Sequence, residues 1–230
     1  MRGVLWSLLL VPVGLWAQEQ AILSLEARLS STPDSLKPEV QRQLAKQYFF
    51  YSFKHPDSVE FRRAILEKGL AIAQQSRDTL LMAAHHLELT HFLPNDSAIK
   101  VLNFYHPMLD SLSRHDFSNT IAALMYASMS IEILKLGGFK KFLARLLYSA
   151  LPEVDYDRAL LHLLQVKLAG EFLVVTYYRL AECYFALRNH RDALASLDAC
   201  LKAEERYPYM DAYFKSRAKA RLERYYRERR

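Results

Sequence analysis

Apolar residues recur every three or four positions along most of this chain, which is the spacing of an amphipathic α-helix. The pattern is clearest from residue 176 to residue 208. There, two apolar stripes flank the polar turn at residues 188–191, so the segment predicts two helices joined by a short turn. The stripe residues are Tyr177, Leu180, Ala181 and Tyr184 before the turn, and Ala193, Leu197, Cys200 and Leu201 after it.

Polar caps and prolines mark the ends of the predicted helices. Asp57 or Ser58 is expected to cap a helix from Val59 to Gln75, and Asp96 or Ser97 one that begins at Ala98. No segment shows the alternation of a strand series. Prolines, which break helices, fall between the periodic segments: they are Pro33, Pro38, Pro56, Pro94, Pro152 and Pro208.

Two segments lie outside this regular pattern. The run from Asp155 to Val175 is almost uniformly apolar and predicts one additional buried helix, with Gly170 near its end. The end of the chain, from Tyr213 to Arg230, predicts a polar helix that caps the last apolar face. Its apolar stripe is Phe214, Ala218, Leu222, Tyr225 and Tyr226.

The helix pair at 176–208 resembles the tetratricopeptide repeat (TPR) family, whose unit is a helix-turn-helix of about 34 residues. Ala181 and Ala193 match the small residues that let the two helices of a repeat approach closely. Degenerate copies of the pattern run from Ala84 to Tyr105 and from Met125 to Pro152. The resemblance implies an all-α fold, a right-handed superhelical stack of antiparallel helix pairs (a TPR-like α-solenoid) with a C-terminal capping helix.

The first 17 residues have the pattern of a secretory signal peptide. Met1 and Arg2 form a short positive start, an apolar run follows, and Ala17 precedes polar residues, so cleavage is expected after Ala17. An uncleaved anchor is the alternative. The predicted organisation is therefore a signal peptide at 1–17, a TPR-like repeat domain at 18–208 and a basic capping helix at 209–230, in a protein that is exported and then periplasmic or secreted.

The net charge of +6 resides at one end of the chain. Residues 215–230 hold eight Lys or Arg and two Glu, and the remainder has equal numbers of basic and acidic residues. Clustered charge can attract nucleic acid or anionic lipid. An exported protein rarely meets nucleic acid, so a solvated capping helix is the preferred interpretation, and weak contact with an anionic membrane surface is the second.

Few residues in this sequence suggest chemistry. His85, His86 and His91 do not have the i, i+4 spacing of helical metal ligands, so no metal is predicted and His91 is expected to pack in the core. No phosphate loop, nucleophile elbow or paired-cysteine motif occurs. The sequence therefore predicts a protein that is not an enzyme and holds no cofactor, with Cys183 and Cys200 as core thiols.

The resemblance also implies where a partner binds, because TPR partners usually lie along the face made by the first helices of the repeats. Packing of the same residues against the helix at 155–175 is the alternative. The six groove positions carried over are Tyr178, Glu182 and Phe185 from the best unit, and His85, Leu89 and Phe92 from the upstream one.

These patterns favour an exported scaffold of the bacterial cell envelope that holds a protein or peptide partner in a helical groove, without catalysis. The first alternative is a structural or assembly subunit that packs through exposed apolar helix faces. The second is an enzyme without a recognisable motif, whose mark would be a pocket with convergent ionisable groups.

Overall fold

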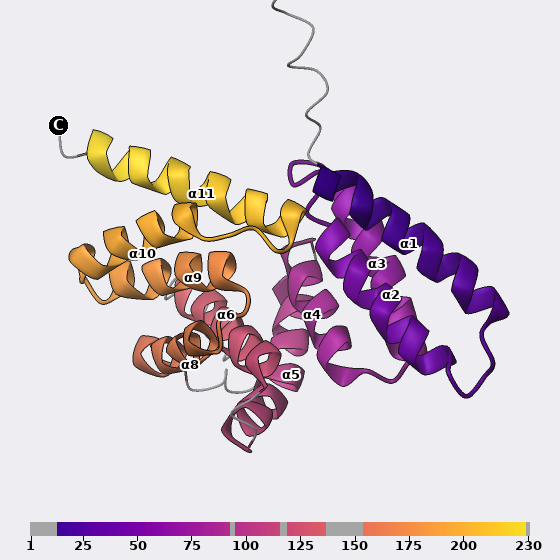
Figure 1. Ribbon diagram of the computed structural model, residues 1–230. Coiled ribbons are helices and arrows are strands. Elements are labelled where there is room, and N and C mark those ends of the chain that lie inside the picture. The colour runs from indigo at the N-terminus through magenta and orange to yellow at the C-terminus, as the bar shows by residue number, and fades with distance from the viewer. Residues whose placement is uncertain (1–12, 93–94, 116–118, 137–153, 229–230) are drawn as a thin grey trace, which may run out of the picture. The chain divides into compact units, whose positions relative to one another are not determined.

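The computed structural model describes residues 13–92, 95–115, 119–136 and 154–228. Within these ranges the chain is all-helical, as predicted: ten α-helices follow one another, and no residue lies in a strand (Figure 1). The chain divides into two compact units, Met1–His85 with Tyr207–Met210, and His86–Arg206 with Asp211–Arg230. The domain boundaries expected from the sequence remain predictions.

The first unit is built on three consecutive helices, α1 (Val13–Ser31), α2 (Lys37–Tyr51) and α3 (Val59–Gln75). Figure 1 shows them side by side. The predicted bounds of α3 are confirmed, and the Ser58 hydroxyl caps it by accepting a hydrogen bond from the amide of Phe61 at 3.3 Å. The buried residues shared by α1 and α2 are Ile22, Leu25, Val40, Leu44 and Tyr48.

Helix α4 (Thr79–Leu89) begins in the first unit and ends in the second. The second unit continues with the 3₁₀ turn η1 (Thr90–Phe92) and then five α-helices. These are α5 (Asn95–His115), α6 (Thr120–Lys135), α8 (Tyr156–Ala169), α9 (Leu173–Ala186) and α10 (His190–Lys202). Most of the last helix, α11 (Pro208–Arg227), also belongs to the second unit. A core of α6, α8 and α9 residues consists of Ala127, Ile131, Ala159, Leu163, Leu180 and Cys183.

The helix pair predicted at 176–208 is present as α9 and α10. Ala181 and Ala193 are fully buried, as close packing of the two helices requires. Both cysteines are buried and free, which confirms the prediction of core thiols, and burial raises the pKa of each to about 12. Membership of the TPR family and the superhelical stack stay predictions, and the second half of the unit at 125–152 lies outside the described residues.

The additional helix expected at 155–175 is present as α8, with Gly170 at its end as predicted, but it is shorter than expected. The chain forms α8, which ends at Gly170, and then starts α9 at Leu173. Gly170 adopts a left-handed conformation (φ 73°), which stops a helix because the backbone turns away from its axis. Helix α8 is also amphipathic rather than buried throughout, since Leu168 is 88% exposed.

One expectation for α5 fails. The helix begins at Asn95, so Asp96 and Ser97 lie inside its first turn and do not precede it. Pro107 lies inside α5, which continues to His115 although proline cannot donate the usual backbone hydrogen bond. The other prolines that the structure describes lie in loops or at helix starts: Pro33, Pro38, Pro56 and Pro208.

The predicted signal peptide lies mostly outside the described residues. The described part of α1 begins at Val13 and runs through Ala17, the residue expected to precede the cleavage site. No helix among the described residues has the length and apolar character needed to cross a membrane.

Candidate functional site

A pocket of about 770 Å³ opens between α9, the first residue of α10 and α11, all within the second unit. It contains the three groove positions predicted on α9. Its lining residues are Tyr178, Glu182 and Phe185 from α9, His190 from α10, and Arg217, Arg221, Arg224, Tyr225 and Glu228 from α11 and the residue after it.

Helix α9 supplies an aromatic wall. Tyr178, Glu182 and Phe185 share one helical face because they are spaced by four and three residues. Tyr178 is buried against Phe214 of α11, with ring centroids 5.4 Å apart. The rings that contact Tyr178 and Phe185 among the described residues come from α10 and α11, not from the segment 155–175 that the packing alternative named.

At the mouth of the pocket three rings form what we call the ring triangle: Phe185, His190 and Tyr225. Their centroids are separated by 5.9 Å, 5.8 Å and 5.8 Å. None of the three is fully buried, and His190 is exposed. The ring triangle therefore offers apolar surface to a ligand from solvent.

Beneath this wall, Glu182 belongs to a buried ion network. Arg179 donates to Glu182 at 2.7 Å and to Glu132 at 2.6 Å, while Lys135 lies 2.6 Å from Glu182 and 3.1 Å from Glu132. Burial alone would raise the pKa of both carboxyl groups, but the two cations outweigh it. The pKa of Glu132 falls to about 2 and that of Glu182 is also lowered, so both are charged near neutral pH.

Helix α11 faces this wall with three arginines, Arg217, Arg221 and Arg224, again spaced by four and three residues. The guanidinium of Arg221 lies 4.7 Å from the centre of the Phe185 ring and 3.4 Å from Glu182. Arg217 donates to the hydroxyl of Tyr213 at 2.8 Å and stands over the ring of Tyr178 at 5.4 Å. These contacts place two of the arginines of the basic tail, Arg217 and Arg221, at defined positions beside α9.

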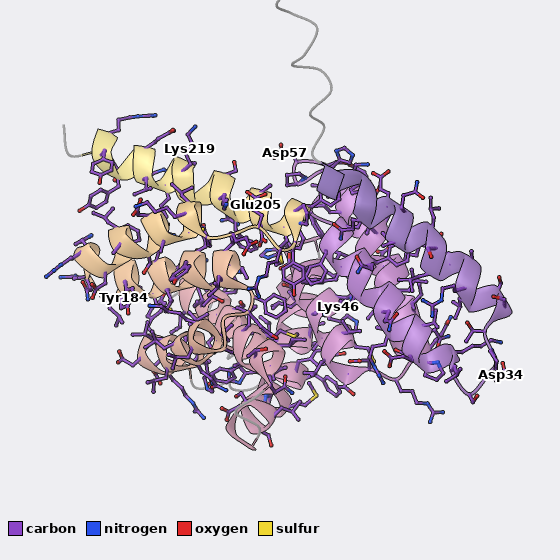
Figure 2. All side chains as sticks on the ribbon, viewed as in Figure 1. Asp34, Lys46, Asp57, Tyr184, Glu205 and Lys219 are labelled. Atoms are coloured by element: carbon purple, nitrogen blue, oxygen red, sulfur yellow. The ribbon has the colours of Figure 1, made fainter. Side chains whose placement is uncertain are left out.

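Of the remaining cations of α11, Lys219 and Arg227 are exposed and Lys215 is half-buried. Lys219, labelled in Figure 2, is exposed and does not line the pocket. Lys215 pairs with Glu205, which is also labelled in Figure 2, at 3.0 Å. The basic tail is thus divided between a pocket wall and a solvated surface.

The upstream groove positions lie elsewhere. His85 is fully buried in the first unit, where its ring lies 5.6 Å from that of Phe49 and its Nδ1 atom 2.8 Å from the carbonyl of Leu81. Leu89 is buried and Phe92 half-buried in the second unit, and none of the three lines the pocket. His91, expected in the core, is exposed because its segment leaves α4 as a 3₁₀ turn.

Sequence reasoning missed the α11 side of this pocket. The arginine spacing was visible, but a basic amphipathic helix at a chain end looks the same whether its cations face solvent or a neighbour. From the sequence, His190 is predicted only as part of a polar turn. Among the described residues no group of three or more His, Cys, Asp or Glu is arranged to hold a metal ion.

Comparison with known proteins adds no family to this description. Neither a family model nor a curated protein matches the chain.

Proposed function

We propose that this chain is an exported, TPR-like scaffold of the bacterial cell envelope that binds a protein or peptide partner and catalyses no reaction. The observation that carries the proposal is the pocket between α9 and α11, where the three predicted groove residues of α9 meet the arginines of α11. Its volume is within the range of sites that hold a ligand. Arginine and aromatic residues are also those most enriched among the residues that dominate binding energy.

The charges in the pocket fit binding better than acid-base catalysis. Glu182 is held as a carboxylate by Arg179 and Lys135, so it has no proton to give near neutral pH. A guanidinium likewise stays protonated and cannot act as a base in this pH range. The remaining groups are suited to attracting and orienting a ligand.

Site-directed photo-crosslinking in an envelope extract tests the proposal. A photoreactive amino acid replaces Tyr225 in the ring triangle, and the matched control carries it at Leu168, which is exposed on α8 and does not line the pocket. We expect one discrete partner at position 225 and not at position 168. The same products at both positions, or none at either, would contradict a binding site in this pocket.

An assembly subunit is the second candidate, because α8 exposes Leu161 (67%) and Leu168 (88%) seven residues apart on one helical face. Sedimentation velocity distinguishes it from the first. An assembly subunit would self-associate as concentration rises and would become monomeric when both leucines are replaced by lysine. The binding scaffold would sediment identically before and after that change.

A further inference from the structure

The charges around Glu182 do not cancel. Three cations, Arg179, Lys135 and Arg221, surround the two carboxylates of Glu132 and Glu182. This group alone leaves one positive charge in surplus. Arg221, the most distant cation at 3.4 Å, carries its guanidinium on the pocket side, over the ring of Phe185.

The other two arginines of the pocket are not paired with carboxylates in the described structure. The contacts of Arg217 are to the uncharged Tyr213 and Tyr178. Arg224 is exposed, and its guanidinium forms no ion pair with the acidic residues that the structure describes. Glu228 adds one negative charge to the lining, so the surface open to a ligand is net positive.

Apolar surface lies within reach of these cations. Arg221 is in direct contact with Phe185, and Phe185 is one corner of the ring triangle, next to Tyr225 on the same turn of α11 as Arg224. A ligand that places an anion on Arg221 and Arg224 therefore brings its adjoining atoms onto the rings. Such a site binds most tightly a ligand in which an anion and an apolar group lie side by side.

We infer that this pocket selects a peptide segment in which a carboxylate stands next to a bulky apolar side chain. The inference rests on the proposed function and specifies its ligand. Carboxylate is the group that an arginine fork binds through two parallel hydrogen bonds. The apolar side chain beside the carboxylate packs against the ring triangle. A free inorganic anion would leave these rings exposed to solvent.

Fluorescence anisotropy with three short labelled peptides tests this selectivity on the full chain. The first is amidated at its C-terminus and alternates glutamate with phenylalanine and leucine. The second replaces each glutamate by glutamine. The third keeps the glutamines but ends in leucine with a free carboxylate.

We expect the glutamine peptide to bind about tenfold more weakly than the first, because it lacks the charge that the arginines recognise. Recovery of affinity in the third peptide would identify a terminal carboxylate as the preferred source of that charge, and no recovery would identify the side chain.

A matched pair of variants tests whether the peptide binds in this pocket. Arg224→Glu reverses a charge that lines it, and Arg227→Glu makes the same change one turn further along α11, outside the lining. Both residues are exposed, so circular dichroism should show intact helices in each variant. We expect Arg224→Glu to weaken the first peptide about tenfold, and Arg227→Glu to change its affinity by less than about twofold.

The outcomes separate this inference from the proposed function. Equal affinity for the first two peptides, or equal losses in the two variants, would overturn the selectivity while a peptide-binding pocket remained. If no peptide binds, but vesicles of anionic lipid bind and lose the interaction with Arg224→Glu, both proposals fail and the pocket faces a membrane surface.

Discussion

Gly69 of α3 occupies a position where no side chain fits. A Cβ atom built there would lie 2.1 Å from Nε2 of His85, 2.7 Å from its Cδ2 and 3.0 Å from Cβ of Tyr48. His85 is fully buried, so its ring has little room to withdraw. The glycine is therefore needed for the close approach of the His85 ring to α3.

Gly69→Ala should consequently destabilise the protein. Alanine gains about 1 kcal/mol of helix propensity over glycine, but forcing a methyl into a packed core costs about 1–3 kcal/mol. We expect the overpacking to dominate, with a net loss of up to about 2 kcal/mol in the free energy of unfolding, measured by urea titration. In a His85→Ala background the same change should become neutral or stabilising. A loss of equal size in both backgrounds would show that the histidine ring is not the obstacle.

One buried and one half-buried histidine, His106 and His86, make the stability of the second unit sensitive to mild acid. Burial lowers the pKa of His106, although Asp110 opposes the shift, and burial also lowers that of His86. His106 lies against the ring of Tyr126, with centroids 4.7 Å apart, and 3.4 Å from the hydroxyl of Ser130. Both histidines are therefore expected to be neutral in the folded protein near pH 7.

The sign of the pH effect follows from these shifts. Each histidine binds a proton more readily in the unfolded chain, where its pKa is about 6.5. The contribution of the neutral histidine to the free energy of unfolding is therefore complete above that pH and is lost as the pH falls. The loss is at most about 1.4 kcal/mol per pH unit for each histidine. Urea titrations at pH 7 and pH 5 should show lower stability at pH 5, with a smaller difference in His106→Gln. An unchanged difference would mean that His106 does not carry the effect.

At the scale of elements, α3 and α9 end in the same way. Each is followed by an exposed arginine in a left-handed conformation, Arg77 (φ 55°) and Arg188 (φ 60°). The next amide reaches back five residues, from Asp78 to the carbonyl of Ala73 at 3.1 Å and from Asn189 to that of Tyr184 at 2.8 Å. This is the Schellman type of helix end, in which glycine is the usual residue at the left-handed position.

Arg188→Gly should therefore stabilise the α9–α10 turn. A left-handed conformation costs a residue with a side chain about 1–2 kcal/mol, whereas the greater freedom of glycine in the unfolded chain costs about 0.4–1 kcal/mol. We expect a net gain of about 0.5–1 kcal/mol in a urea titration. Ala195→Gly, at an exposed position inside α10, is the control and should lose about 1 kcal/mol. A loss at position 188 would contradict the observed backbone conformation.

The elements differ in how far the sequence could predict them. Periodicity and caps were sufficient for α3 and for the α9–α10 pair, because their apolar stripes and polar ends agree. The stretch 155–175 misled because exposed Leu161 and Leu168 give α8 the composition of a buried helix. The α9 half of the pocket followed from a repeat-like pattern, whereas its α11 half depends on which face of a basic helix meets α9, and tertiary packing decides that face.

At the scale of the whole molecule, cleavage after Ala17 is predicted to shorten α1, which begins at Val13 in the described structure, but to keep the contacts that hold the rest of the helix. The Nε2 atom of Gln18 donates to the carbonyl of Gln47 at 3.4 Å. Glu19 forms an ion pair with Lys54, and the hydrogen bond between these two side chains is the main reason that the pKa of Lys54 rises to about 12. Cleavage after Ala17 keeps both residues. Intact-mass measurement of the exported protein should therefore give a chain that begins at Gln18, and Ala17→Leu should block processing. A mass equal to the full chain would favour the uncleaved anchor.

The central claim is that the pocket between α9 and α11 is where a partner binds. Two-dimensional NMR of the isotope-labelled chain, titrated with the amidated glutamate peptide, tests it most directly. The account predicts that shifted amide and arginine Nε–H signals cluster at Phe185, His190, Arg221, Arg224 and Tyr225, while signals of α1 to α3 stay in place. Shifts that concentrate in the first unit, or no shifts at saturating peptide, would contradict it.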